Sequence, residues 1–230
     1  MYTGSSTEVD AGALGPPWYH TGVIALDLDA DPRLIYPGDA RLAPIPELGL
    51  AVAYLTAAPE DDPDVAQARA AALAFVGRHP DALLRTCLQG HVTCSALLVD
   101  HACARGLLLL HRKHGRWLQP GGHADGDGNL AHVAARELVE ETGLTPIELL
   151  ARPIAVDVHE VAPRGEAPHL HLDVRFVARA SADAAPVAND EAAALRWFDE
   201  RALVDPSGPL GEGGRRLARR GFAAARARFL

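Results

Sequence analysis

Three glutamates in the middle of the chain have the residue type and the spacing that metal chemistry needs. Glu137, Glu140 and Glu141 stand at i, i+3 and i+4, so on a helix their side chains lie on one face. Each like-charged pair costs about 0.2–0.5 kcal/mol, so helix stability gives no reason for the cluster. A bound Mg²⁺ would remove the repulsion, because it prefers carboxylate oxygens and substrate phosphates as ligands. The alternative is a solvated helix face, which is what most acidic triplets are.

The residues around the glutamates favour chemistry over a solvated face. Gly121 and Gly122 lie upstream, where the missing Cβ lets the backbone approach a phosphate or a metal closely. Arg136 adjoins Glu137 and can fix a carboxylate by a charge-assisted hydrogen bond. Together these residues resemble the box of the Nudix hydrolase family, G-x5-E-x7-R-E-U-x-E-E-x-G-U with U aliphatic. The matching residues, all at the family's spacing, are Gly122, Arg136, Glu137, Leu138, Glu140, Glu141, Gly143 and Leu144.

One specified position of the box departs from the family pattern. The family's early glutamate falls on Gly128, and two carboxylates, Asp125 and Asp127, lie nearby in the loop GGHADGDGN. Either aspartate can substitute through a small loop adjustment. Because that glutamate mainly supports the loop–helix geometry in the family, the departure concerns the loop more than metal binding.

The resemblance implies a role for each matching residue. Nudix proteins share an α/β/α sandwich around a mixed sheet and typically hydrolyse a nucleoside diphosphate linked to another moiety, using Mg²⁺ or Mn²⁺. By position, Glu137, Glu140 and Glu141 would ligate the metal directly or through water, and one of them would act as base. The carbonyl of Gly121 would be a further ligand, and Arg136 would orient Glu137.

Residues outside the helix are expected to complete the site. Many family members recruit one more acidic residue from a loop before the final strand, and Glu191 in NDEAAALRWF is our choice, with an ordinary polar loop as the equal alternative. Gly122 and His123 are expected to contact substrate, His123 as a hydrogen-bond donor to a substrate phosphate or as a proton shuttle. Arg112 and Arg116 precede the box in a strand–turn and are expected to line its phosphate end.

Histidines form a second conspicuous set. His169 and His171 are two apart on a predicted strand and share a face. A structural role is the alternative for any single histidine, since many are partly buried and hydrogen-bonded. No Cys/His pairs have the spacing of zinc sites, so a zinc site made only of histidines is not expected. The set comprises His111, His114, His123, His132, His159, His169 and His171.

The composition of the chain narrows the classes of partner that the protein is expected to bind. The formal net charge of −8 argues against a surface built to capture nucleic acid duplexes. No stretch approaches the ~20 apolar residues of a membrane helix, and the first residues lack the basic and apolar runs of a signal peptide. Three cysteines without CxxC spacing predict reduced thiols and a cytoplasmic protein; these are Cys87, Cys94 and Cys103.

The region before the box, residues 1–88, is expected to be a small α+β unit of unknown role. Residues 1–17 are rich in Gly, Ser and Pro, which predicts a lead-in without regular structure. Residues 21–29 and 48–56 are predicted as strands. Asp62 and Pro63 predict a helix start, with apolar helical spacing until Pro80.

The box lies in a predicted α/β domain over residues 89–205. Strands are expected at 91–100, 106–113, 154–159, 169–178 and 194–198, and a helix at 129–142 that Gly143 ends. This order predicts a sheet covered on both faces. Residues 206–230 are expected to form a linker and an arginine-rich helix. This helix either contacts a membrane or an anionic ligand, or it packs Leu217, Phe222 and Phe229 onto the rest of the protein.

The combined prediction is an α/β, Nudix-like α/β/α sandwich that uses Mg²⁺, or Mn²⁺, to hydrolyse a small-molecule diphosphate such as a nucleoside diphosphate derivative. One alternative substrate is a non-nucleotide diphosphate such as an isoprenoid, including isomerisation with Cys94 as the catalytic thiol. Another alternative is a non-catalytic nucleotide sensor. A homodimer is expected only from the frequency of symmetric small enzymes.

Overall fold

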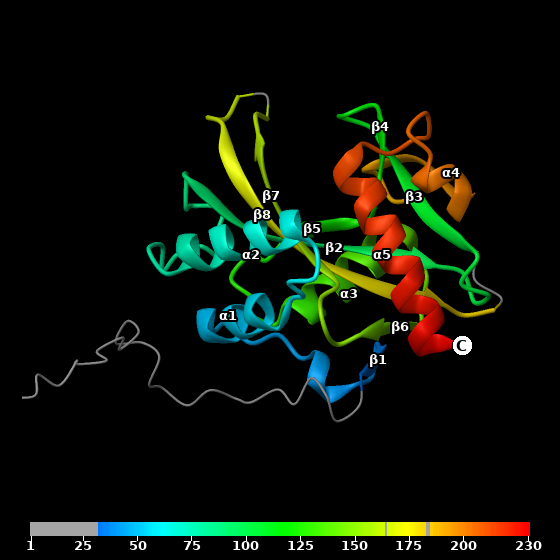
Figure 1. Cartoon of the computed structure of the whole chain (residues 1–230), viewed down its shortest axis with the longest axis horizontal. Coiled ribbons are helices and arrows are strands. Elements are labelled where there is room, and N and C mark those ends of the chain that lie inside the picture. The colour runs from blue at the N-terminus through cyan, green and yellow to red at the C-terminus, as the bar shows by residue number, and fades with distance from the viewer. Residues whose placement is uncertain (1–31, 164, 183–184) are drawn as a thin grey trace, which may run out of the picture.

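The computed structural model describes residues 32–163, 165–182 and 185–230 (Figure 1). These residues form one nine-stranded mixed sheet with helices on both faces. The predicted lead-in at 1–17 and the predicted strand at 21–29 lie outside the described residues. The predicted α/β sandwich around a mixed sheet is confirmed.

Two long strands run parallel through the centre of the sheet. β2 (Gly90–Val99) pairs with β8 (His169–Ala180), and the register places His91 opposite His171. The strand order is β1-β6-β8-β2-β3-β4, and three further strands lie off this path, with β5 pairing with β2, β7 with β8 and β9 with β3. Every pair except β2–β8 is antiparallel. The other strands are β1 (Arg33–Tyr36), β3 (Arg105–His111), β4 (Arg116–Leu118), β5 (Gly121–His123), β6 (Ile147–Leu150), β7 (Ala155–Val161) and β9 (Ala192–Asp199).

The helices bury the two faces of the sheet in separate clusters. On β2, Val92 and Cys94 belong to the cluster that contains α1 (Leu48–Ala57), α2 (Pro63–Val76) and α3 (Leu130–Thr142). Leu97 and Val99, also on β2, belong to the cluster under α4 (Glu200–Val204) and α5 (Glu212–Phe229). Figure 1 shows α5 crossing in front of the central strands. Alternate side chains of one strand therefore serve opposite layers.

The prediction of a strand at residues 48–56 is wrong, because this segment is the helix α1. The run is apolar throughout rather than alternating, and periodicity alone does not separate a buried strand from a buried helix in such a run. Of its five buried residues, Leu50, Ala51, Tyr54 and Leu55 follow a helical period, and Val52 is the fifth. Contact with the body of the protein on this one stripe decides in favour of the helix.

The prediction of a helix after Asp62 is confirmed by α2. Asp62 caps it, with its carboxylate accepting hydrogen bonds from the backbone N–H groups of Asp64 and Val65, and Pro63 occupies the first turn. The helix ends at Val76, before the predicted stop at Pro80. Residues of α1 and α2 share one core cluster with α3 and the sheet, so this region packs directly against the domain that bears the box.

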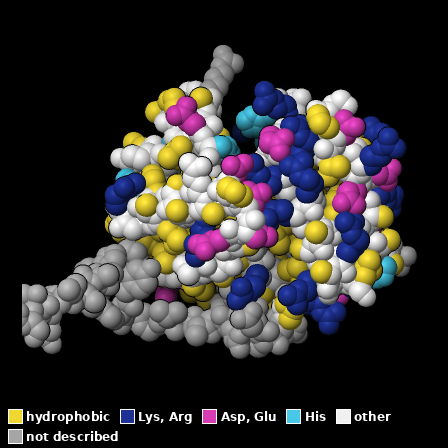
Figure 2. Space-filling model, viewed as in Figure 1, with side chains coloured by type: hydrophobic (Ala, Val, Ile, Leu, Met, Phe, Trp, Pro, Cys, Tyr) yellow, Lys and Arg dark blue, Asp and Glu magenta, His cyan; other side chains and the backbone are white. Residues whose placement is uncertain are grey.

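The C-terminal helix α5 packs its apolar side onto the sheet, as one of the two alternatives predicted. Leu217, Phe222 and Phe229 are buried. Its arginines pair with carboxylates, for example Arg220 with Asp61 and Arg226 with Glu200. Figure 2 shows basic and acidic side chains interspersed over this face. Within the described residues, no helix has the length and apolar character needed to cross a bilayer.

Candidate functional site

The helix α3 is held at both ends by local interactions. The side chain of Asn129 accepts a hydrogen bond from the backbone N–H of His132 and caps the N-terminus. Gly143 follows the last turn with φ of 66°, the left-handed conformation that favours glycine at a helix end. One face of α3 is buried through Ala134, Ala135 and Leu138. The predicted helix and both of its ends are confirmed.

Two of the three glutamates lie directly against the backbone of β5. The backbone N–H of Gly121 donates a hydrogen bond of 2.8 Å to Oε2 of Glu141. A Cβ on Gly122 would lie 2.4 Å from the carboxylate carbon of Glu137. Only glycine at position 122 therefore leaves Glu137 where it is. The structure thus brings Gly121, Gly122, Glu137 and Glu141 together.

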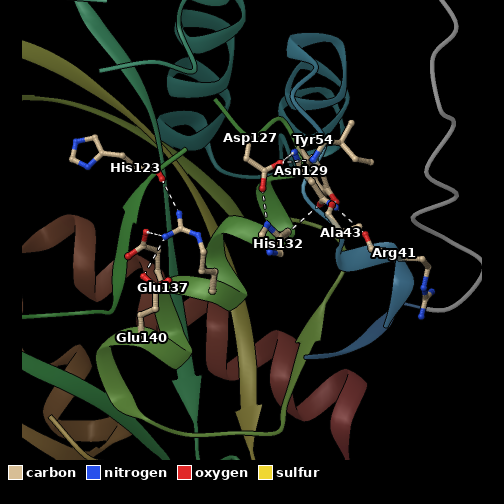
Figure 3. Close-up of polar contacts among 11 residues, drawn as sticks. Arg41, Ala43, Tyr54, His123, Asp127, Asn129, His132, Glu137 and Glu140 are labelled. Atoms are coloured by element: carbon tan, nitrogen blue, oxygen red, sulfur yellow. Dashed lines mark hydrogen bonds and ion pairs between the residues drawn. The ribbon is translucent and has the colours of Figure 1, made fainter. Parts of the chain in front are cut away.

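Arg136 joins the glutamates to the strand. Its Nη1 lies 2.8 Å from Oε1 of Glu137 and 3.2 Å from Oε2 of Glu140. Its Nη2 donates to the backbone carbonyl of His123 at 3.2 Å. In Figure 3 the His123 carbonyl faces this guanidinium, whereas the His123 ring points away from the glutamates. The guanidinium of Arg136 therefore pairs with two carboxylates. Glu140 is the exposed one of the three glutamates.

The protonation of these carboxylates reflects their crowding. Burial, partly opposed by the hydrogen bond from Gly121 and reinforced by the charges of Glu137 and Glu191, raises the pKa of Glu141 to about 8. Burial also raises the pKa of Glu137, against the nearby charge of Arg136. Glu141 therefore keeps its proton at neutral pH, and Arg136 is the cation that pairs with the other two glutamates. An additional positive charge beside Glu141 would stabilise its ionised form.

Of the other predicted site residues, Glu191 acts on this cluster through its charge, whereas Arg112 and Arg116 do not pair with it. The backbone carbonyl of Glu191 accepts a hydrogen bond from the N–H of Arg112, and the charge of Glu191 acts on Glu141. Arg112 and Arg116 lie exposed at the ends of the β3–β4 hairpin. In the described part of the chain, neither arginine forms an ion pair with the glutamates of α3. Sequence proximity alone suggested that these two arginines line the phosphate end.

The loop before α3 shows why Gly128 replaces the family's glutamate. A Cβ at position 128 would lie 1.9 Å from the backbone oxygen of Glu47, and the Gly128 N–H donates to the carbonyl of Ile45 at 2.7 Å. The segment before α1 thus occupies the space that a side chain would need. Asp127 fixes the loop instead, because its Oδ1 accepts from the backbone N–H groups of Ile45 and Asn129.

Asn129 links the same segment to the start of α3. Its amide group donates to the carbonyls of Arg41 and Ala43, each at 2.8 Å, and its carbonyl oxygen accepts from the hydroxyl of Tyr54 at 2.9 Å (Figure 3). Asn129 is fully buried. The position of α3, and hence of its glutamates, depends on a region in which the sequence showed no chemical motif.

Sequence reasoning missed Arg85, which follows α2. Arg85 forms a two-point ion pair with Asp125 at 2.7 and 2.8 Å. The charges of Glu137 and Glu191 also act on it. Burial first, and the charge of Arg85 second, lower the pKa of His123 to about 4. No local pattern marks Arg85, because its partners come from the loop of the box.

Sequence reasoning also missed a row of polar side chains on the central strands. Ser95 donates to Oδ2 of Asp173 at 2.8 Å, and the Arg175 guanidinium binds both Asp173 and Asp157. Ser95, Asp173 and Arg175 are buried. The signal was available in HLHLDVR (169–175), where polar residues alternate with apolar ones on a strand whose apolar positions are buried.

The one thiol considered for chemistry, Cys94, is inaccessible. Cys94 is fully buried in the cluster under α3, and burial raises the pKa of its thiol well above the usual value. Its environment is that of a packing residue rather than of a nucleophile. All three cysteines of the chain are free and buried.

Residues 91–220, more than half of the chain, match the family described as the NUDIX domain. Among solved structures, a NUDIX-family hydrolase from Clostridium perfringens is similar at 24% identity, covering 58% of this chain and 97% of that one, with a TM-score of 0.48. An Ap4A hydrolase from C. elegans is similar at 18% identity, covering 59% and 97%, with a TM-score of 0.48. The NUDIX domain of Shewanella oneidensis NrtR, complexed with ADP ribose, is similar at 22% identity, covering 59% and 87%, with a TM-score of 0.44. The comparison with curated proteins finds no match.

Proposed function

This chain belongs to the Nudix family, hydrolases of phosphorus-containing acid anhydrides, and we propose that it cleaves a diphosphate linkage in a nucleotide or nucleoside diphosphate derivative with Mg²⁺. The observation that supports the proposal is that buried Glu141 and partly buried Glu137 lie against the Gly121–Gly122 backbone, while Arg136 pairs with Glu137 and Glu140. Carboxyl oxygens crowded together beside a single arginine suit a hard divalent cation, which would favour their ionised form.

The donor set fits magnesium. Glu137, Glu140 and Glu141 supply carboxylate oxygens, the Gly121 carbonyl supplies a backbone oxygen, and Glu191 is the further carboxylate whose charge already acts on Glu141. When bound, Mg²⁺ neutralises charge on the phosphoryl oxygens and activates a water. Mn²⁺ has the same preference for oxygen ligands and is expected to replace it.

The side chains of the chain then have distinct tasks. Oε2 of Glu141 is occupied by the Gly121 N–H, so its Oε1 is the oxygen we assign to the ion or to a proton from the attacking water. Arg136 keeps Glu137 and Glu140 from turning away, since it binds both of them and the His123 carbonyl. Gly122 leaves room for Glu137, and we assign contact with a substrate phosphate to Gly122 and His123.

The test is a panel of dinucleotides, sugar nucleotides and nucleoside triphosphates, with product masses measured with and without Mg²⁺. We expect Mg²⁺-dependent cleavage of at least one class, and a loss of roughly 100-fold or more in kcat for Glu141→Gln and Glu137→Gln, the scale typical of removing a catalytic acid–base or metal-binding group. Glu166→Gln, at an exposed carboxylate, is the matched control and should keep full activity.

Three outcomes would contradict the proposal. Tight nucleotide binding without turnover in Mg²⁺ or Mn²⁺ would favour the sensor. Cleavage confined to isoprenoid or sugar diphosphates would move the substrate outside nucleotides. Isomerised rather than cleaved product would call for a thiol, which the burial of Cys94 disfavours.

We propose that the protein is cytoplasmic, because its three cysteines are all free and buried. The division into residues 1–88, 89–205 and 206–230, and the homodimer, stay predictions. Size-exclusion chromatography with light scattering measures the assembly directly.

A further inference from the structure

We propose that His91, His123 and His171 form a second metal site, selective for a transition-metal ion of the Zn²⁺ class and separate from the carboxylates of α3. One ligand nitrogen from each ring can be chosen so that the three lie within 4.8 Å of one another. The ring centroids form a nearly equilateral triangle, with sides of 4.8, 5.1 and 5.2 Å. Three strands contribute one histidine each.

The sheet register holds these rings together. His91 on β2 lies directly opposite His171 on the parallel strand β8. On its other side β2 pairs with β5, where His123 lies opposite Thr93. The three side chains therefore project from adjacent strands, on backbone that the sheet hydrogen bonds fix. Such a framework preorganises ligands better than a loop does.

An unpaired polar atom inside the cluster independently indicates a ligand. His91 is 4% exposed, and in the described residues its Nε2 is the one buried side-chain nitrogen or oxygen without a hydrogen-bond partner. Buried polar groups nearly always have partners, so an orphaned ring nitrogen calls for one. Its Nδ1 lies 3.5 Å from the carbonyl of Cys87. One ring nitrogen facing a backbone carbonyl and the other left free is the arrangement of histidines that ligate metals.

The chemistry of the donors selects the ion. Neutral imidazole nitrogens suit Zn²⁺, Co²⁺, Ni²⁺ and Cu²⁺, whereas Mg²⁺ requires oxygen ligands. Zinc with three protein ligands keeps a fourth position for water or an anionic oxygen. Zn–N bonds of about 2.0–2.1 Å put tetrahedral ligand nitrogens about 3.3 Å apart, so nitrogens up to 4.8 Å apart would close by up to about 1.5 Å on binding. The ring of His123 points away from the glutamates, so the two donor sets do not merge (Figure 3).

Two further histidines flank the triangle and can support it. His169 and His171 have ring centroids 5.3 Å apart, and Nδ1 of His169 lies 2.9 Å from the carbonyl of Ala167. The His159 ring lies 5.7 Å from that of His171, and its Nδ1 lies 2.9 Å from Oδ2 of Asp157. These contacts fix the rings of His159 and His169. The two fixed rings limit the side-chain rotations open to the three proposed ligand histidines.

The experiment titrates Co²⁺, a spectroscopic substitute for Zn²⁺, into the full chain without a polyhistidine tag and in excess Mg²⁺. We expect one equivalent to bind with the strong visible absorption of four-coordinate cobalt, and Zn²⁺ to displace it. His91→Gln, His123→Gln and His171→Gln should each weaken Co²⁺ binding at least tenfold. Circular dichroism and thermal unfolding check that each variant folds.

The controls separate this site from its neighbours. His111→Gln removes a ring from the His111–His114 pair, and Glu137→Gln removes a carboxylate; both should bind Co²⁺ as the wild type does. Cys87→Ser matters because His79, Asp81 and Cys87 also come close enough to hold an ion. Loss of the cobalt spectrum in Cys87→Ser or Glu137→Gln, but not in the three histidine variants, would overturn the proposal.

A measurement on the wild type keeps the test independent of variant folding. The zinc-edge X-ray absorption spectrum of the zinc-loaded protein should show the scattering of about three imidazole rings. A first shell of carboxylate oxygens, or of sulfur, would place the ion elsewhere. No measurement here uses catalytic activity, so failure of this proposal and failure of the proposed hydrolysis are distinguishable.

Discussion

The two halves of the box are built on opposite principles. In the helix half, Glu141 is buried and Glu137 is partly buried, and burial raises the pKa of both, so ionising them in the folded state costs free energy. In the loop half, Asp127, Gly128 and Asn129 are tied to residues 41–47 by hydrogen bonds and close packing. The helix half therefore has the residues that chemistry requires, and the loop half has those that packing requires.

The largest expected effect is on stability and comes from the loop half. Asn129→Ala leaves the carbonyls of Arg41 and Ala43 and the hydroxyl of Tyr54 without their buried partner. We expect a loss of about 3 kcal/mol in the free energy of unfolding, from several orphaned hydrogen-bonding groups at about 1 kcal/mol each. Urea denaturation at equilibrium measures it.

A helix-half substitution provides the contrast for Asn129→Ala. Glu140 is the exposed glutamate, so Glu140→Gln should change the free energy of unfolding by less than about 0.5 kcal/mol. Tyr54→Phe removes one of the hydrogen bonds to Asn129 and should fall between the two, near 1 kcal/mol. Equal losses for Asn129→Ala and Glu140→Gln would erase the distinction between the halves.

Restoring the family's glutamate should damage the loop half. In Gly128→Glu the new Cβ meets the backbone oxygen of Glu47, and we expect a loss of about 2 kcal/mol, typical of overpacking. Gly128→Ala should lose nearly as much, because the clash is with the Cβ and not with the carboxylate. Thermal unfolding compares both variants with the wild type; a glutamate that leaves stability unchanged would show that the Glu47 segment yields easily.

In the absence of metal, a substitution in the helix half should raise the free energy of unfolding, whereas the substitutions in the loop half lower it. Without divalent cations, Glu141→Gln should be more stable than the wild type at pH 8, since the raised pKa is a stability penalty at high pH. Below pH 4.5 the Glu141 carboxyl is protonated in both folded and unfolded states, so the two proteins should match. Between pH 4.5 and about 8 the folded state keeps a proton that the unfolded state releases, and wild-type stability therefore falls as pH rises.

Denaturant unfolding in EDTA across this pH range measures the difference between wild type and Glu141→Gln. Added Mg²⁺ should stabilise the wild type more than the variant and close the gap, because a ligand stabilises the state that binds it. Glu166→Gln, with its exposed carboxylate, should follow the wild-type curve throughout. A wild-type curve that does not fall toward pH 8 would remove the evidence that these carboxylates are strained.

A further small stability effect is expected at the surface of the loop half. Arg85 and Asp125 form an exposed ion pair, so Arg85→Met should lower the free energy of unfolding by less than about 1 kcal/mol. The same change should raise the pKa of His123, because burial remains while the nearby positive charge is lost. Nuclear magnetic resonance of the His123 ring measures this pKa, and an unchanged value would show that Arg85 does not act on the site.

Sequence patterns predicted best what is local. The spacing of Glu137, Glu140 and Glu141 and the glycine after Thr142 define α3. The long strand β2 follows from its apolar run, and β8 from its alternation of polar and apolar residues. The segment at 48–56 was assigned to the wrong element, because a short apolar run fits both a strand and a helix. The short strands β1 and β6 were not predicted, since four residues have little pattern of their own.

The sequence by itself determined the carboxylate cluster and its family, because helix geometry is fixed by neighbours three and four residues apart. Only the tertiary structure decided why position 128 is glycine, since the clash comes from Glu47. It also decided that His91 meets His171, eighty residues away in the sequence, through the register of two parallel strands. Sheet register is a long-range property that spacing along one chain segment does not specify.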